Sequence, residues 1–134
     1  RYPPMKLYRP VGVAELRLIA ELDWQGYPPR LPGQPIFYPV LEHDYAIQIA
    51  RDWNVVDEAS GYAGFVTAFE ITAECASRYE VQAVGSTQHR ELWVPAEELD
   101  KFNASIVGSI QVQEAFYGDA YEGDQPPIDL PGAR

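Results

Sequence analysis

Glu91 is the strongest candidate in this sequence for a chemically active side chain. Residues 88–103 predict a short strand, a stop at Pro95 and then a helix or helical turn. Side chains on a strand alternate between two faces, so Glu91 and Trp93 point one way while Leu92 points the other. One face of this strand can therefore join the core while the Glu91 carboxylate faces a cleft.

Few other side chains point to metal, cysteine or phosphate chemistry. Cys75 is the single cysteine, which excludes a disulfide framework and a cysteine-rich metal site and fits a cytoplasmic location. His43 and His89 are the two histidines and lie far apart in the sequence, so no metal site is predicted. The glycines have the spacing of neither common phosphate-binding loop.

Length and charge limit the class of protein. A chain of 134 residues is long enough for one hydrophobic core, and we expect a single domain. The formal net charge of −10 argues against general binding to nucleic acid or to anionic membrane surfaces. No apolar run approaches the roughly 20 residues of a membrane span. The sequence does not indicate an oligomeric state.

The first half of the chain predicts two strands and two helices around a stiff loop. Residues 6–9 precede a proline and favour a strand, whereas apolar side chains recur at helical spacing over residues 13–22. Prolines at four positions in residues 26–35 predict an irregular surface loop. A second strand at 36–40 precedes a helix that Asp44 is expected to cap. The apolar stripe of that helix contains Tyr45, Ala46, Ile49, Ala50 and Trp53.

Strands dominate the second half. A polar loop at 54–64 leads into the clearest strand, at 65–71, and shorter helical turns separate the remaining strands. This distribution of helices and strands favours an α+β fold over a doubly wound parallel sheet. We expect the domain to cover residues 1–117, with residues 118–134 forming an acidic, proline-rich tail that has no core of its own. The other predicted segments are strands at 79–84 and 106–116 and helical turns at 73–78 and 96–103.

Several segments resemble a family of short bacterial proteins. They are LYRPVG at 7–12, PPRLP at 28–32, QPIFYPV at 34–40 and YAIQIARDWN at 45–54. Proteins of that family generally carry ADP-ribosylation and crystallin in their label. The resemblance extends over about residues 7–116.

The chain also resembles, more distantly, the ADP-ribosyltransferase fold. In that fold a first strand carries an Arg or His that holds NAD, a second strand carries an aromatic or hydroxyl residue before an alanine-containing helix, and a late strand carries a catalytic Glu. This sequence matches the order with Arg9, Tyr38, the pair Tyr45-Ala46 and Glu91. The resemblance implies two abutting, mainly antiparallel small sheets that bind NAD between them, with helices from the N-terminal half.

What the resemblance implies chemically is cleavage of the bond between nicotinamide and ribose, with NAD as a substrate. Such cleavage passes through an oxocarbenium-like state, which the catalytic Glu91 would stabilise. Arg9 would grip the NAD phosphates or ribose, and Tyr38 would stack on nicotinamide. One branch of the ADP-ribosyltransferase superfamily uses a tyrosine on the second strand and a second tyrosine in the following helix. Tyr45 is an approximate match for that second tyrosine. Because the acceptor supplies the nucleophile, no metal is implied.

Two departures leave the acceptor unassigned, whether protein or small molecule. Arginine-modifying members place Glu or Gln two residues before the catalytic Glu, whereas this chain has His89, which we expect to face the acceptor. No Ser-Thr-Ser run follows the second strand. The function that the resemblance implies is that of an NAD-dependent mono-ADP-ribosyltransferase or NAD glycohydrolase. The alternative is a non-catalytic module that keeps the fold and binds a protein or a nucleotide.

Each candidate also has a simpler interpretation. Glu91 can be an exposed strand carboxylate paired with a neighbour such as Arg90, and Arg9 can be a surface cation beside a proline. Core packing is the simplest role for three aromatic residues, Tyr38, Tyr45 and Trp53, and it is the favoured one for Trp53.

Overall fold

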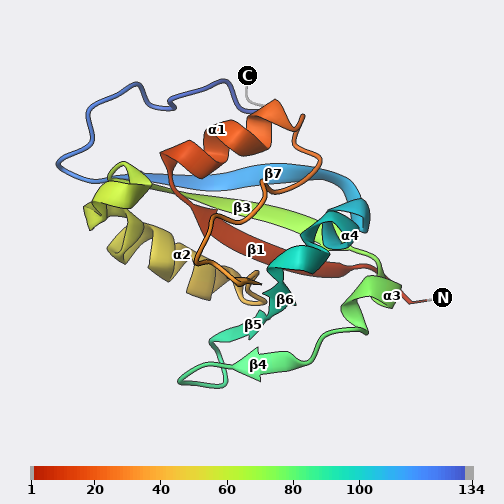
Figure 1. The fold of residues 1–134 in the computed structure, drawn as a ribbon. Helices are drawn as coiled ribbons and strands as arrows, with labels where there is room; N and C mark the ends of the chain where they lie inside the picture. Colours follow the sequence, from red (N-terminus) through yellow and green to blue (C-terminus); the bar gives the residue numbers. More distant parts are fainter. Residues whose placement is uncertain (1, 132–134) are drawn as a thin grey trace.

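The computed structural model describes residues 2–131 and has an α+β fold, which confirms the predicted fold class (Figure 1). The first half contains β1 (Met5–Val11), α1 (Val13–Glu21), β2 (Ile36–Phe37), α2 (His43–Asp52) and the 3₁₀ turns η1 (Asn54–Val56) and η2 (Glu58–Ser60). The second half contains β3 (Ala63–Ile71), α3 (Ala73–Ala76), β4 (Val81–Ala83), β5 (Arg90–Leu92), β6 (Val94–Pro95), η3 (Ala96–Glu98), α4 (Leu99–Ala104) and β7 (Ile106–Tyr117).

The strands form three small antiparallel groups. The largest has the order β1-β3-β7, and the others are the pairs β2-β6 and β4-β5. Val40 connects the β1-β3-β7 sheet with the β4-β5 pair, because it bridges Tyr8 of β1 on one side and Glu91 of β5 on the other. The backbone N–H groups of Tyr8 and Val40 each donate to the other residue's carbonyl at 2.8 Å. Segments far apart in sequence, around residues 9 and 91, are thereby brought to one region.

Strand β3 is buried on both faces. Leu7 and Phe65 face a core beneath α1 and α4, whereas Tyr8 and Val66 face a smaller cluster beneath α2. Because side chains on a strand alternate faces, this two-sided burial explains why β3 reads as an almost continuous apolar run. The largest fully buried residues of the main core include Leu16, Ile19, Tyr27, Phe37, Phe102 and Ile110.

Two glycines allow the layers to approach closely. A Cβ on Gly64 would lie 2.6 Å from the carbonyl oxygen of Ala50, so glycine lets α2 pack directly on β3. A Cβ on Gly12 would lie 2.6 Å from the Cα of Ser60, at the turn between β1 and α1. The second contact draws η2 against the start of α1 and shapes one wall of the pocket described below.

Helix α2 differs from its prediction at both ends. It begins at His43 with Glu42 in the N-cap position, so Asp44 lies in the first turn and the prediction that Asp44 caps the helix is wrong. It ends at Asp52, and the predicted core residue Trp53 is 61% exposed. Ala46 and Ala50 are the buried residues of the apolar stripe.

Most other elements agree with their predictions. The strand at β4 is shorter than predicted, and the predicted loop at 54–64 contains η1 and η2 before β3 begins. Over residues 2–131, none of the helices combines the length and apolar character needed to cross a membrane.

The segment after β7 runs back past α1 (Figure 1). Its half-buried side chains Tyr121, Ile128 and Leu130 pack against the main core. Arg1 and residues 132–134, which belong to the predicted domain and tail, lie outside the described residues.

Candidate functional site

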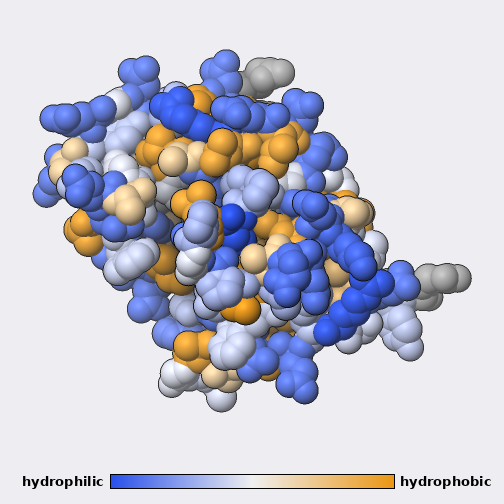
Figure 2. All heavy atoms as spheres, viewed as in Figure 1, coloured by the Kyte–Doolittle hydropathy of each residue, from blue (hydrophilic) through white to orange (hydrophobic). Residues whose placement is uncertain are grey.

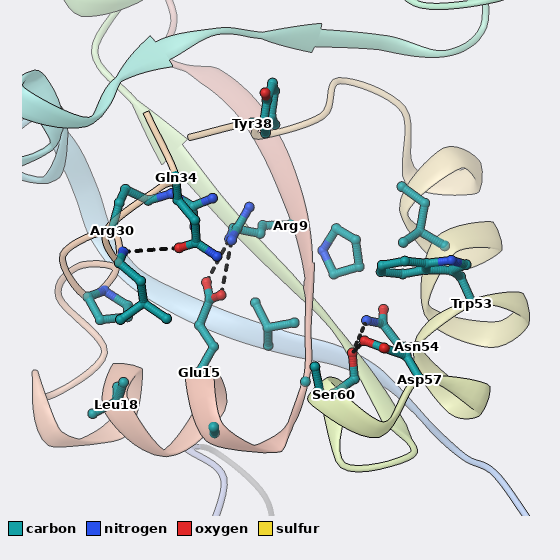
Figure 3. Close-up of a pocket in the computed structure, with 18 of the residues that line it drawn as sticks. Arg9, Glu15, Leu18, Arg30, Gln34, Tyr38, Trp53, Asn54, Asp57 and Ser60 are labelled. Atoms are coloured by element: carbon teal, nitrogen blue, oxygen red, sulfur yellow. Dashed lines mark hydrogen bonds and ion pairs between the residues drawn. The ribbon is translucent and has the colours of Figure 1, made fainter. Parts of the chain in front are cut away.

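A pocket of about 640 Å³ lies between β1, α1, the proline-rich loop and the end of α2. Three of the predicted site residues, Arg9, Tyr38 and Glu91, line it although they come from separate segments. Figure 3 shows Arg9 and Glu15 facing one another on one side, with Trp53 and Asn54 on another. The volume lies within the range of about 300–1,000 Å³ that small-molecule sites occupy. Apolar side chains of α1, including Leu18, are exposed on the same face (Figure 2).

Arg9 is held by Glu15. Its Nε donates to Glu15 Oε2 at 2.7 Å and its Nη2 donates to Glu15 Oε1 at 3.0 Å, and the Arg9 side chain is only 12% exposed. Burial by itself would lower the pKa of Arg9, but the charge of Glu15 and its hydrogen bonds outweigh burial and raise that pKa. The interpretation of Arg9 as a surface cation is therefore wrong. Its positive charge is, however, already neutralised within the protein.

Aromatic rings form the floor beneath Arg9. The guanidinium carbon of Arg9 lies 4.6 Å from the ring centroid of Phe37 and 6.0 Å from that of Tyr27. The Tyr27 hydroxyl lies 2.7 Å from Thr67 Oγ1, and Thr67 Oγ1 donates to the backbone carbonyl of Arg9 at 2.7 Å. Tyr27 then donates to Thr67, because the single hydroxyl proton of Thr67 is used. Burial raises the pKa of Tyr27. This buried chain fixes the Arg9 backbone against β3.

Glu91 is held differently, by two uncharged donors. The Tyr45 hydroxyl donates to Glu91 Oε2 at 3.1 Å and the Trp93 indole donates to Glu91 Oε1 at 2.9 Å. Glu91 and Trp93 share a face of their strand while Leu92 is fully buried, as the alternation predicted. Glu91 is only 8% exposed, and Arg90 pairs with Glu42 instead. An exposed carboxylate paired with Arg90 is therefore excluded as the role of Glu91.

Tyr45 and His89 are not among the residues that line the pocket. Tyr45 donates a hydrogen bond to Glu91, and His89 contacts Tyr45. Desolvation and the neighbouring Glu91 charge raise the pKa of Tyr45 to about 12. The ring of His89 stacks on that of Tyr45, with centroids 4.4 Å apart and planes 12° apart. The acceptor-facing role of His89 stays a prediction, and its observed contact is with the back of the tyrosine that supports Glu91.

Tyr38 is a wall residue and not a core aromatic. It is 42% exposed, lines the pocket and meets Trp93 edge-to-face with ring centroids 6.5 Å apart. Trp93 thus contacts both Tyr38 and the carboxylate of Glu91. An exposed aromatic face beside a buried carboxylate suits a flat ligand group that carries a partial positive charge.

Arg30 is a lining residue that the sequence interpretation missed. Its Nε is shielded from solvent and has no hydrogen-bond partner among the described residues. Desolvation and the positive charge of Arg9 lower the pKa of Arg30. A buried donor without a partner typically costs about 1–3 kcal/mol. Its position in the PPRLP segment was visible in the sequence, but a loop cation gives no sign of burial.

Asn54 supplies a second unpaired polar atom in the same pocket. Its Nδ2 donates to Ser60 Oγ at 2.8 Å, and Ser60 Oγ donates to Asp57 Oδ2 at 2.6 Å. Because Ser60 gives its only proton to Asp57, it must accept from Asn54, which leaves the buried Asn54 Oδ1 without a partner. Both unpaired buried polar side-chain atoms of the described residues, Arg30 Nε and Asn54 Oδ1, thus belong to pocket residues.

The pocket therefore combines a buried carboxylate held by neutral donors, two guanidinium groups, an aromatic wall and two unpaired polar atoms. Such a lining fits a polar ligand with an anionic group and a flat group. Comparisons of the sequence with protein-family models and with curated proteins give no match.

Proposed function

We propose that this protein is an NAD-dependent mono-ADP-ribosyltransferase, or an NAD glycohydrolase, that adopts an ADP-ribosyltransferase-like fold. NAD is a substrate, and the acceptor is a protein or small molecule whose identity is open. The single observation that carries the proposal is that Arg9, Tyr38 and Glu91, from three separate segments, line one pocket. The pattern was assigned from residue order along the chain, so their meeting in space supports it independently.

Glu91 has the character required of the catalytic carboxylate. Its donors, Tyr45 and Trp93, are neutral, so its negative charge is oriented but not cancelled. Each oxygen accepts one hydrogen bond and keeps capacity for another, which ribose hydroxyls can use. A fixed negative charge in a site shielded from water stabilises the positive charge that develops on ribose.

The proposed reaction breaks the bond between C1′ of the nicotinamide ribose and the ring nitrogen. The bonding electron pair leaves with nicotinamide, which becomes neutral, and C1′ takes on oxocarbenium character. Water, or a nucleophile of the acceptor, then adds an electron pair to C1′ and releases a proton to solvent. Tyr38 stacks on nicotinamide in this scheme and holds the leaving group in line.

Nicotinamide release is the direct test. The purified protein is incubated with NAD, and nicotinamide, ADP-ribose and any ADP-ribosylated protein are separated and quantified. Release with free ADP-ribose indicates hydrolysis, whereas release without it indicates transfer. If neither nicotinamide release nor NAD binding is detected, the proposal fails.

The second candidate is a non-catalytic module that binds a protein or a different nucleotide. The observation that favours it is the ion pair between Arg9 and Glu15, which occupies the guanidinium assigned to NAD. Thermal unfolding separates the candidates. A ligand present at about 100 times its Kd stabilises the folded state by about 2.7 kcal/mol, a shift of several degrees for a domain of this size. An unchanged Tm at millimolar NAD, with a shift for another nucleotide, favours the module.

A further inference from the structure

Arg9 was assigned to the anionic part of the ligand, yet its hydrogen-bonding fork is occupied. Two of its nitrogens donate to the two oxygens of Glu15, and the pair lies on the pocket wall. A ligand phosphate would have to displace a carboxylate that already has the ideal bidentate geometry. The net charge of this pair is zero, so it offers little attraction to an anion.

Arg30 lies beside this pair with no such partner. The guanidinium carbons of Arg9 and Arg30 lie 4.6 and 5.9 Å from the ring centroid of Phe37, so both cations share one aromatic surface. The nearby carboxylate of Glu15 pairs with Arg9. None of the ion pairs found among residues 2–131 includes Arg30, and its buried Nε has no hydrogen-bond partner there.

The loop that carries Arg30 is stiff. Pro28 and Pro29 precede it directly, and proline fixes the backbone φ angle. The side-chain oxygen of Gln34 accepts a hydrogen bond from the backbone N–H of Leu31 at 3.0 Å, which closes the loop just after Arg30. Pro28, Pro29, Leu31 and Gln34 also line the pocket. Arg30 is thus held at the pocket by a segment that loses little freedom when a ligand binds.

We propose that Arg30, and not Arg9, is the residue that binds the anionic group of the ligand, and that this group is a phosphate or diphosphate. The two terminal nitrogens of the planar Arg30 guanidinium donate to two phosphate oxygens. Arg9 and Glu15 then act as a neutral wall that positions the neighbouring groups. The inference rests on the proposed function only in taking the diphosphate to be that of NAD.

Calorimetric titration with ADP-ribose and with inorganic pyrophosphate tests the inference. Loss of a charge-assisted hydrogen bond corresponds to a loss of affinity of about 10- to 100-fold, and we expect this loss for Arg30→Gln with both probes. Arg30→Lys, which keeps the charge but not the fork, should fall between wild type and Arg30→Gln. Arg9→Lys, which can keep the ion pair to Glu15, should lose less than about threefold.

Arg51→Gln is the matched control, because Arg51 is exposed, pairs with Asp52 and lies outside the pocket. It makes the same change in net charge as Arg30→Gln. An equal loss of affinity in both variants would assign the effect to overall charge and overturn the inference. Thermal unfolding should show Arg30→Gln to be at least as stable as wild type, since the Arg30 side chain makes no ion pair in residues 2–131 and its buried Nε has no partner there.

The outcomes separate this inference from the proposed function. Arg30-dependent binding of ADP-ribose without nicotinamide release would support the inference and contradict the enzyme. Nicotinamide release with normal ADP-ribose binding by Arg30→Gln would support the enzyme and overturn the inference. Binding of pyrophosphate but not ADP-ribose would keep Arg30 as a phosphate site and reject the dinucleotide. If wild type binds neither probe, the inference is wrong.

Discussion

Two of the carboxylates that line the pocket, Glu15 and Glu91, have opposite surroundings. Glu15 faces the guanidinium of Arg9 and its charge is cancelled, whereas the hydrogen-bond donors to Glu91 within residues 2–131 are the neutral groups of Tyr45 and Trp93. A salt bridge stabilises the fold, whereas a carboxylate oriented by neutral donors can still stabilise positive charge on a ligand. The comparison indicates that Glu15 is structural and that Glu91 is the residue suited to chemistry.

The largest difference should appear when each carboxylate is replaced by its amide. Glu15→Gln leaves the buried guanidinium of Arg9 without a counter-charge, and we expect a loss of about 2–4 kcal/mol in the free energy of unfolding. Glu91→Gln keeps an acceptor oxygen and should cost less than about 1 kcal/mol. Urea unfolding followed by tryptophan fluorescence measures both values. Equal losses would mean that the two carboxylates are not held as the hydrogen bonds indicate.

A smaller effect is expected when the donors to Glu91 are removed. Tyr45→Phe deletes the hydroxyl that donates to Glu91 Oε2, and Trp93→Phe deletes the indole N–H that donates to Oε1. Each variant should lose about 1–2 kcal/mol of stability, because both side chains are partly exposed. Tyr79→Phe is the control, since its hydroxyl donates to Glu98, away from the pocket. Should the Tyr45 and Trp93 variants unfold like wild type, Glu91 is not anchored by these donors.

The smallest effect concerns proton binding by Tyr45. Desolvation and the Glu91 charge raise its pKa to about 12, above the unfolded value of 10.0. Between these pH values the unfolded state loses the proton first, so the free energy of unfolding falls as pH rises. Carbon NMR of labelled tyrosine, assigned with Tyr45→Phe, should give a midpoint near pH 12 that decreases in Glu91→Gln. The same midpoint in both proteins would show that the Glu91 charge does not affect the pKa of Tyr45.

Local patterns were sufficient for most of the fold. Apolar spacing located α1, and the alternation around Glu91 and Leu92 correctly separated the pocket face from the core face. Helical periodicity failed at Trp53, because spacing along a helix does not show whether other elements cover its last turn, and the ring of this C-cap residue is exposed at the pocket. Asp44 failed as a cap because the helix begins at His43, two residues before the start that a cap at Asp44 implies.

The site was only partly accessible from sequence, for a physical reason. The order of residues along the chain predicted Arg9, Tyr38 and Glu91 as site residues, and these three do line one pocket. The partners of the charges could not be predicted, because they depend on tertiary contacts. Glu15 reaches Arg9 only because the chain turns sharply at Gly12, and the burial of Arg30 Nε depends on how its loop packs beside Phe37.

Cleavage of NAD at saturating concentration tests most directly whether Glu91 is the charged group that the reaction uses. The rate of nicotinamide release is compared for wild type, Glu91→Gln and Glu97→Gln, whose side chain is exposed and outside the pocket. We expect Glu91→Gln to release nicotinamide about 10²- to 10³-fold more slowly, with wild-type stability and little change in KM. Glu97→Gln should match wild type. Wild-type release by Glu91→Gln would contradict the assignment.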